Sequence, residues 1–317
     1  MIGTDINFAA SVLKRGGLVG IPTETVYGLA GNALDEQSVL KIFTAKNRPH
    51  FDPLILHFAD FSVVEKYVEF IPDIFQAIAI DHSPGPITFL LKKKPLISDL
   101  VTSGSDLVAV RIPNHKITLS LLSQLDFPLA APSANPFGYI SPTTAKHVEK
   151  QLGDKIDYIL DGGPCDVGLE STIISLDNDG SLVIHRKGGL EIDSFKKYGL
   201  PISIKDQSTS NPSAPGMLLS HYAPRKKLYL GNLETLAESF GDQKVAILAF
   251  SNESQYPKGF LTKILSPEGD LRAAAKNVFS YLRLLDEDEQ IAVIIAEEVP
   301  DQGLGLAIND RLRRAAF

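Results

Sequence analysis

Hydrophobic and polar positions follow two periods along this chain, and the two periods predict its helices and strands. Apolar residues spaced three and four apart indicate helices over residues 5–16, 36–46, 61–80 (in two pieces broken at Pro72), 117–125, 141–153, 233–240, 271–285 and 307–316. Short apolar runs bounded by turn residues indicate strands over residues 17–21, 54–58, 87–92, 107–113, 128–131, 156–160, 173–176, 182–186, 227–230, 245–250, 262–265 and 291–296. Such an alternation is typical of an α/β protein.

The hydrophobic pattern is interrupted over about residues 203–224, where Pro, Gly and polar residues dominate. This composition predicts a linker. We therefore expect a first domain over residues 1–204, a linker over 205–225 and a small C-terminal α/β domain over 226–317, with a parallel sheet in the last of these. Gly303-Leu304-Gly305 before the last helix lacks the full dinucleotide-binding pattern, so we expect tight packing to explain these glycines.

Residues 21–58 bring several polar side chains together between two predicted strands. The turn Thr23-Glu24-Thr25 follows the first strand, and Asp35 is expected to cap the helix that ends with Lys46. Arg48 follows that helix, and His57 lies in the next strand. Two cations, two hydroxyl groups and an imidazole at one place suit a phosphorylated ligand. The alternative is structural: Lys46 favours the helix dipole, and Arg48 is a surface residue.

A third cation, Arg111, is expected in the middle of the strand over residues 107–113, among small apolar neighbours. A buried guanidinium is costly without an anionic partner. That partner is either an Asp or Glu of the same chain or the carboxylate of a substrate, which a guanidinium binds with two hydrogen bonds. Ser133 and Asn135 follow another strand in a turn of small residues, where a ligand can approach the backbone. Taken alone, this segment is better explained as an ordinary polar turn.

Three further residues have an ordinary structural explanation from the sequence alone. Ser141, followed by Pro142, predicts the start of the helix that runs to about residue 153. Arg186 ends a predicted strand, where an arginine is often simply solvated. Tyr222 lies in the predicted linker, and the alternative for it is a spacer with a chance aromatic residue.

Composition narrows the classes of function. The 317 residues are 44% hydrophobic and 22% charged, as in an ordinary globular protein, and the net charge of −7 argues against broad attraction to nucleic acid. The single cysteine excludes an internal disulfide, and no Cys–His metal set is present. No apolar run approaches a membrane span and no signal peptide is evident, so we expect a cytoplasmic protein without a membrane partner.

Several motifs resemble one family. PTETVYGL, the step Lys46-Asn47-Arg48-Pro49, DPLILHF and the pair Ser133-x-Asn135 look like the signature of the YrdC-like threonylcarbamoyl-AMP synthases. Pro215-Gly216-Met217 and residues 221–224 (HYAP) resemble the linker motif of the long form of this family, which implies that the linker over residues 205–225 folds over the active site. Asp52 stands where the family pattern has Asn. The resemblance covers nearly the whole chain.

The resemblance implies a fold, a reaction and a site. The fold would be a YrdC-like twisted mixed sheet with flanking helices, followed by a smaller Rossmann-like parallel α/β domain. The enzyme would convert L-threonine, bicarbonate and ATP to threonylcarbamoyl-AMP and pyrophosphate, and a separate transferase would pass the product to adenosine 37 of tRNA. Threonine would be held by Thr25, His57, Arg111, Ser171 and the backbone of Ala131. ATP would be held by Lys46, Arg48, Asp52, Ser133, Asn135, Ser141, Arg186, Tyr222 and the backbone of Leu107, with Lys46 and Arg48 as the catalytic pair. Mg²⁺ would travel with the phosphates, without a protein metal site, and direct tRNA binding would be weak or absent.

The candidate residues are rich in cations and hydroxyl groups, and no nucleophile stands beside a base. That inventory favours catalysis by positioning and charge neutralisation. Two alternatives stay open. One is a module that binds double-stranded RNA without chemistry, and the other is a related domain that transfers a carbamoyl group to a different acceptor.

Overall fold

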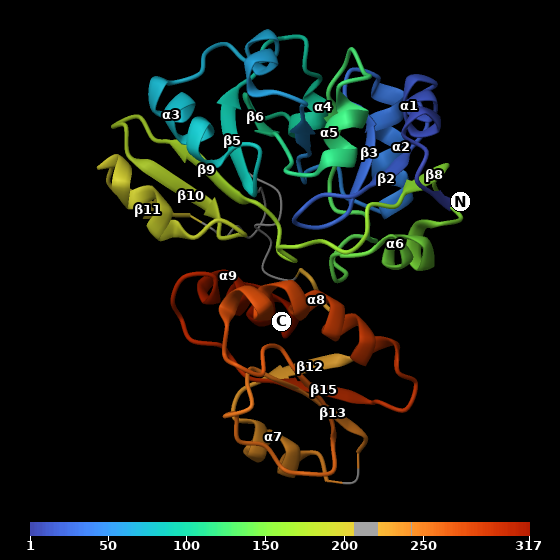
Figure 1. Ribbon diagram of the computed structural model, residues 1–317, viewed down its shortest axis with the longest axis vertical. Helices are drawn as coiled ribbons and strands as arrows, with labels where there is room; N and C mark the ends of the chain where they lie inside the picture. Colours follow the sequence, from blue (N-terminus) through green and yellow to red (C-terminus); the bar gives the residue numbers. More distant parts are fainter. Residues whose placement is uncertain (206–220, 242) are drawn as a thin grey trace.

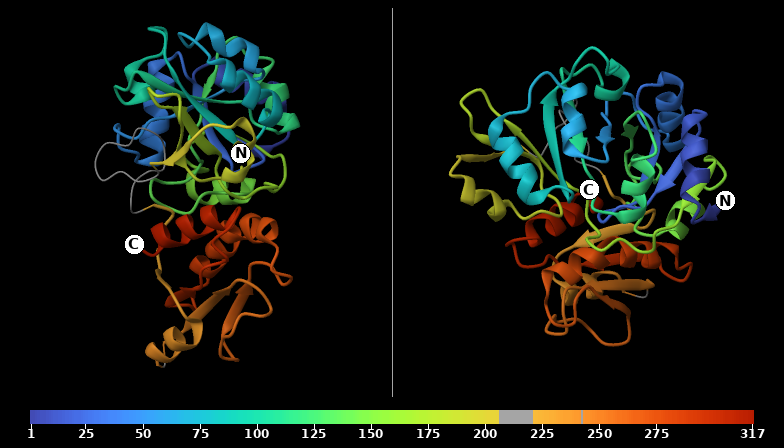
Figure 2. Two further views of the ribbon diagram at one scale, coloured as in Figure 1. Left: turned by 90° about the vertical axis from the view of Figure 1, so that its left-hand side faces the viewer. Right: turned by 45° about the horizontal axis from the view of Figure 1, so that its top comes forward.

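Two β-sheets organise the protein in the computed structural model, which describes residues 1–205, 221–241 and 243–317 (Figure 1). The larger sheet and its helices form the upper part in that view, and the smaller sheet and its helices form the lower part. Figure 2 shows the same two parts from two further directions. The predicted class, a mixed α/β sheet followed by a smaller parallel α/β sheet, is confirmed.

The larger sheet is mixed and has eleven strands within the described residues. From one edge to the other they are β1 (Ile2–Gly3), β8 (Tyr158–Leu160), β2 (Val19–Ile21), β3 (Gly28–Asn32), β7 (Leu129–Ala130), β4 (Ile55–His57), β6 (Leu107–Arg111), β5 (Ile87–Lys92), β9 (Thr172–Leu176), β10 (Leu182–Arg186) and β11 (Ile202–Ile204). Its helical segments are α1 (Ile6–Lys14), α2 (Glu36–Lys46), η1 (Phe61–Lys66), α3 (Asp73–His82), α4 (Asp99–Thr102), α5 (Lys116–Leu122), α6 (Ala145–Leu152) and η2 (Ile192–Tyr198).

The smaller sheet is parallel throughout the part that the structure describes. Its strands follow the order β12 (Lys227–Leu230), β15 (Val293–Ala296), β13 (Val245–Ala249) and β14 (Leu261–Ile264). Its helices are α7 (Leu233–Ser239), α8 (Leu271–Glu287) and α9 (Gly305–Ala315). In Figure 1, α8 and α9 lie on the face that is turned towards the larger part, and α7 lies on the opposite face. A Cβ on Gly305 would lie 1.9 Å from the carbonyl oxygen of Pro300, so the prediction of tight packing there is confirmed.

The two parts share a hydrophobic core. Val26, Ile140 and Leu169 of the larger part are at most 6% exposed, and they belong to one cluster with residues of α8 and α9 such as Phe279. A Cβ on Gly168 would meet backbone atoms of α8 at 2.5 Å, so the two backbone segments approach as closely as glycine allows. The second part is therefore packed against the first and does not depend on the linker alone for its place.

One predicted helix start was wrong. α6 begins at Ala145, and the hydroxyl of Thr144 caps it by accepting the backbone N–H of His147 at 3.2 Å. The hydroxyl of Ser141 instead donates to the carboxylate of Glu170 at 2.5 Å. The serine that resembled a cap therefore has a partner far away in the chain.

Strand β3 has no counterpart among the predictions. Its sequence, Gly-Leu-Ala-Gly-Asn, contains none of the β-branched or aromatic residues that are enriched in strands. It nevertheless pairs antiparallel with β2 on one side and with β7 on the other. Neighbouring strands thus impose a conformation that the local sequence does not favour. The first piece of the 61–80 helix is also a 3₁₀ segment, η1, and Arg111 ends its strand instead of lying in the middle.

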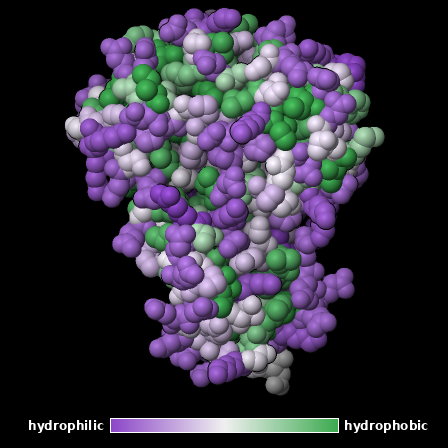
Figure 3. All heavy atoms as spheres, in the orientation of Figure 1, coloured by the Kyte–Doolittle hydropathy of each residue, from purple (hydrophilic) through white to green (hydrophobic). Residues whose placement is uncertain are grey.

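Only residue 205 and residues 221–225 of the predicted linker are described. Just before it, residues 202–204 form an edge strand, β11, which pairs in parallel with β10. Residues 206–220, with Pro215-Gly216-Met217, lie outside the described residues, whereas His221 to Pro224 are described. No helix in the described ranges is both long and apolar enough to cross a membrane. The face in Figure 3 intersperses hydrophilic and hydrophobic residues over both parts.

Candidate active site

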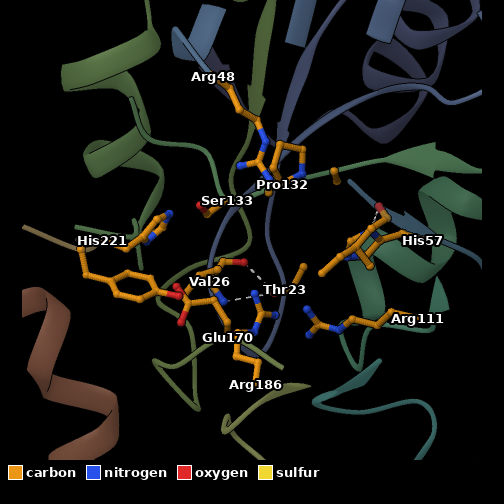
Figure 4. A pocket seen from close by; sticks show the side chains of 14 residues that line it. Thr23, Val26, Arg48, His57, Arg111, Pro132, Ser133, Glu170, Arg186 and His221 are labelled. Carbon is orange, nitrogen blue, oxygen red and sulfur yellow. Dashed lines mark hydrogen bonds between the residues drawn. The ribbon is translucent and has the colours of Figure 1, made fainter. Parts of the chain in front are cut away.

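A cavity lies where the central strands of the larger sheet face the short segment that begins at residue 221. Its lining residues are Thr23, Val26, Gly28, Arg48, Ile55, His57, Arg111, Ala131, Pro132, Ser133, Glu170, Arg186, His221 and Tyr222. In Figure 4, His57 and Arg111 lie on one side and His221 on the opposite side, while the guanidinium groups of Arg48 and Arg186 point in between them. Three guanidinium groups therefore surround one space.

His57 and Arg111 lie side by side because the parallel strands β4 and β6 pair them in register. Nη2 of Arg111 donates to Oγ1 of Thr25 at 2.8 Å and forms an ion pair with the carboxylate of Glu24, also at 2.8 Å. Nε of Arg111 is buried and has no hydrogen-bond partner among the described residues. The acidic partner that the sequence allowed for Arg111 is therefore present in the same chain. The guanidinium also lines the cavity, and its Nε is left to bind a ligand.

The imidazole of His57 is neutral at physiological pH. Burial, followed by the charge of Arg111, lowers its pKa to about 3. Its Nδ1 lies 3.1 Å from the carbonyl oxygen of Ile55, which can only accept, so Nδ1 carries the proton. The other ring nitrogen is then an acceptor at the wall of the cavity, which suits a hydroxyl or ammonium group of a ligand.

Lys46 ends α2, and its side chain is almost fully buried. Its Nζ donates to the backbone carbonyl of Ser133 at 2.5 Å and to that of Asn135. Burial and the neighbouring Arg48 lower the pKa of this amine well below its ordinary value. An anion bound close by would favour the charged ammonium form.

Arg48 leaves the helix through a sharp turn at Asn47, which is left-handed with φ of 51°. Its Nε and Nη2 donate to the carbonyls of Asp52 and Pro53 at 3.0 and 2.7 Å, and Nη2 lies 2.9 Å from the Asp52 carboxylate. The loop therefore fixes the direction of this guanidinium. Asp52 itself is completely buried behind Arg48.

The opposite wall combines Arg186 with a buried acid. Nε and Nη2 of Arg186 donate to the backbone oxygen and the hydroxyl of Ser171, at 3.0 and 3.1 Å. Burial lowers the pKa of this guanidinium to about 10. Glu170 accepts from Ser141 at 2.5 Å and from Arg311 of α9 at 2.9 Å. An acid in this cavity was not predicted, because Glu170 resembled no more than a residue at the start of a strand.

His221 and Tyr222 close one side of the cavity. Tyr222 is 1% exposed and has φ of 66°, a left-handed conformation that is uncommon for a bulky residue. Its ring stacks on Phe279 of α8 at 5.5 Å and meets the ring of His221 at 4.1 Å. A strained conformation held by packing is typical of residues at functional sites.

The predicted site residues form an inner group and an outer group. Those that line the cavity are Arg48, His57, Arg111, Ala131, Ser133, Arg186 and Tyr222. Those that contact a lining residue from behind are Thr25, Lys46, Asp52, Ser141 and Ser171. Asn135 supports Lys46 through its backbone. Leu107 starts β6 at the end opposite Arg111 and packs in a small apolar cluster with Ile55.

Sequence reasoning missed several lining residues, of which Glu170 and His221 are polar and largest in chemical consequence. His221 lies in the HYAP motif (residues 221–224), directly before Tyr222, and this adjacency was the sequence signal that could have identified it. Within the described ranges, no group of three or more His, Cys, Asp or Glu residues is arranged to hold a metal ion. The carboxylates near the cavity, Glu24, Asp52 and Glu170, are each paired with an arginine.

Comparison with known proteins places the chain in a class. A family model of the Sua5, YciO and YrdC proteins, described as "Telomere recombination", matches residues 11–188. A second model, described as "Threonylcarbamoyl-AMP synthase, C-terminal domain", matches residues 189–317. The first model covers β2 to β10 of the larger sheet, and the second covers β11, the lining residues His221 and Tyr222, and the whole smaller sheet.

Curated relatives narrow the class further. The threonylcarbamoyl-AMP synthase of Pyrococcus abyssi is 38% identical over 327 residues, which cover 98% of this chain and 94% of the relative. That of Bacillus subtilis is 37% identical over 319 residues, with 97% and 92% covered. The chain belongs to the threonylcarbamoyl-AMP synthase family, in the form that has both domains.

One solved structure matches nearly the whole fold, and another matches part of it. The crystal structure of Pyrococcus abyssi Sua5 complexed with L-threonine matches with a TM-score of 0.91 at 38% identity, and covers 98% of this chain and 94% of that one. Escherichia coli YciO matches with a TM-score of 0.53 at 22% identity and covers 59% of this chain, which shows a likeness of fold alone.

Proposed function

We propose that this protein is an L-threonylcarbamoyladenylate synthase. It converts L-threonine, bicarbonate and ATP to threonylcarbamoyl-AMP, pyrophosphate and water. The single observation that carries the proposal is the convergence of Arg48, Arg111 and Arg186 on one cavity, in a chain that belongs to this family. An amino acid and a nucleotide triphosphate together bring several negative charges, which this cluster of cations would neutralise.

Threonine occupies the side of the cavity formed by His57 and Arg111. The guanidinium of Arg111 binds the carboxylate through its remaining donors, while Glu24 and Thr25 hold it in place. His57 offers a neutral acceptor to the side chain or amine of the substrate. Ser171 and the backbone of Ala131 complete this end. The bound L-threonine in the structure of the Pyrococcus abyssi relative supports this assignment.

The nucleotide occupies the remaining cavity between Arg48, Arg186 and Tyr222. Arg48 and Arg186 face the triphosphate, Ser133 bonds an oxygen of it, and the ring of Tyr222 packs on the nucleoside. Lys46, Asp52, Asn135 and Ser141 support this wall from behind, and the backbone of Leu107 is a further proposed contact of the nucleotide. Mg²⁺ arrives with the phosphates, because the carboxylates nearby already pair with arginines.

The chemistry then depends on positioning. The amine of threonine attacks the carbon of bicarbonate, a C–O bond of bicarbonate breaks and water leaves, which gives a carbamate. A carbamate oxygen then attacks the α-phosphorus of ATP. The bond from that phosphorus to the bridging oxygen breaks, and pyrophosphate leaves with the electron pair. Lys46 and Arg48 stabilise the charge that develops on the phosphates. No residue of the chain forms a covalent intermediate in this scheme.

The product has a defined destination in this proposal. Threonylcarbamoyl-AMP passes to a separate transferase that modifies adenosine 37 of tRNA, so the protein acts in the cytoplasm and needs no strong contact with tRNA itself. In this proposal residues 1–204 form the catalytic domain and 226–317 the second domain, while His221 and Tyr222 of the linker between them line the cavity.

One assay tests the function. The full chain is incubated with ATP, Mg²⁺, bicarbonate and one amino acid at a time, without RNA, and products are read by mass and by pyrophosphate release. The expected product is threonylcarbamoyl-AMP, and we expect alanine and serine to give far less of the corresponding adenylates. Absence of any adenylate would overturn the proposal in favour of a binding module. Equal products from every amino acid would favour a carbamoyl transferase with a different acceptor.

A further inference from the structure

Arg311 reaches the wall of the cavity from the other domain. It lies in α9, and its side chain is completely buried. Nε donates to the carboxylate of Glu170 at 2.9 Å, Nη2 donates to the carbonyl of Lys187 at 2.9 Å, and Nη1 donates to the carboxylate of Asp310. Glu170 lines the cavity. A residue of the second domain thus contacts the site through one intermediate.

The same guanidinium also supports Tyr222, which lies beside Glu170 in the wall of the cavity. Cζ of Arg311 lies 4.8 Å from the centre of the Tyr222 ring, within the range of a cation–π contact. The ring is held between this guanidinium and Phe279 of α8. Arg311 therefore touches both a charged wall residue and the aromatic residue that closes the cavity.

The charge of Glu170 poses a problem for an anionic ligand. Although burial opposes ionisation, Arg311 and Arg186 hold the pKa of Glu170 below its usual value, so the carboxylate is ionised. An ionised carboxylate beside the triphosphate repels it and attracts Arg186, unless a cation outside the cavity neutralises it. Arg311 is placed for that task, because it contacts Glu170 without lining the cavity.

We propose that Arg311 is a positioning residue of the site: it neutralises Glu170, so that the carboxylate does not weaken the attraction of Arg186 for the phosphates, and it holds Tyr222 over the nucleotide. The inference rests on the proposed function. It gives the second domain a direct role in binding ATP, whereas threonine binding at His57 and Arg111 lies on the far side of the cavity (Figure 4).

The test is a charge rescue. Pyrophosphate release is measured against ATP concentration, at saturating threonine and bicarbonate, for the wild type, Arg311→Met, Glu170→Gln and the double variant. Arg311→Met is expected to raise the KM for ATP by about tenfold or more, with the KM for threonine changed less than about threefold. The double variant is expected to recover much of the loss, because it removes the unneutralised carboxylate.

Controls separate this role from simple docking. Arg313→Met lies on the same helix but removes a half-exposed pair with Glu298, and it is expected to leave both KM values unchanged. Circular dichroism checks folding, and Arg311→Gln replaces the Met variant if that one does not fold. An unchanged KM for ATP in a folded Arg311 variant, or a double variant no better than the single one, would overturn the inference. A wild type that makes no adenylate would instead sink the proposed function.

Discussion

Arg111 illustrates at the scale of one residue how a buried cation serves the fold and the ligand together. The sequence left open whether its partner is an acid of the chain or a substrate. The structure pairs one terminal nitrogen with Glu24 and Thr25 and leaves Nε buried and without a described partner. A buried donor without a partner is costly, so a ligand that bonds it gains affinity.

Replacement of Arg111 is therefore expected to affect threonine far more than ATP. Loss of a charged hydrogen bond of about 1.5–3 kcal/mol raises the KM for threonine by roughly 10- to 150-fold in Arg111→Ala. The KM for ATP is expected to stay within about threefold of the wild type. Steady-state pyrophosphate release checks both values. Equal increases for the two substrates would remove Arg111 from the threonine site.

Lys46 and Arg48 are expected to matter for turnover itself. Each Ala variant should lower pyrophosphate release by about 100-fold or more, because both cations stabilise charge on the phosphates during transfer. Lys41→Ala is the matched control: it lies on the same helix, and its amine only bonds the carbonyl of Gly16 at the surface. Near-normal turnover in either variant would exclude that residue from the phosphate end.

Most polar residues of the cavity could be found from sequence, and the exceptions have a physical reason. Arg48 and Ser133 follow a predicted helix end and a predicted strand end, and Arg111 stood out as a cation inside a predicted apolar strand. Glu170 could not be found, because its importance comes from Ser141 and Arg311, which are distant in the chain. Only the fold brings those three side chains together.

At the scale of elements, the end of α2 decides where Arg48 points. Asn47 is left-handed, and its backbone N–H bonds the carbonyls of Phe43 and Thr44. Asn and Gly tolerate this conformation, whereas a β-branched residue does not. The turn therefore releases the chain from the helix at the one place that aims Arg48 into the cavity.

Two substitutions at residue 47 test this arrangement. Asn47→Gly is expected to retain stability and activity. Asn47→Val is expected to cost about 1–2 kcal/mol and to lower turnover, because the strained turn displaces Arg48. Urea unfolding measures the first effect and pyrophosphate release the second. Equal behaviour of the two variants would show that the left-handed turn has no role.

Prediction of elements succeeded where local sequence and packing agree. Asp35 caps α2 as expected, by accepting the N–H of Gln37 at 3.1 Å. Strand β3 was missed because its conformation is decided by the two strands that pair with it. The start of α6 was predicted wrongly because Ser141, which resembled a helix cap, bonds Glu170 instead. Local propensity carries no information about such partners.

At the scale of the whole molecule, the docked second domain is expected to be needed for activity. A chain cut after about residue 205 is expected to keep the larger sheet folded, because most of its main core cluster lies within the sheet and its own helices. It should lose most pyrophosphate release, since it lacks Tyr222 and the residues of α8 and α9 that contact Tyr222 and Glu170. Circular dichroism and the activity assay check both halves of this prediction. An active truncated protein would contradict it.

Acid is expected to destabilise the whole fold through buried neutral histidines. Burial lowers the pKa of His185 to about 4, and its Nε2 lies 2.7 Å from the hydroxyl of Ser175. Because the unfolded residue titrates near 6.5, the unfolded state binds more protons between about pH 6.5 and 4, and stability falls as the pH is lowered through that range. His185→Gln should lose about 2 kcal/mol less than the wild type between pH 7.5 and 4.5. Urea unfolding at both pH values measures it, and an equal loss in both proteins would contradict the prediction.

The core shared by the two parts affects how the protein folds during synthesis on the ribosome. Leu169 finds its apolar partners in α8, which is translated about a hundred residues later, on the order of ten seconds at common elongation rates. Throughout that delay, the apolar surface around Val26, Ile140 and Leu169 of the emerging first domain is exposed to solvent. A nascent chain stalled before α8 would therefore present a ready target for a chaperone.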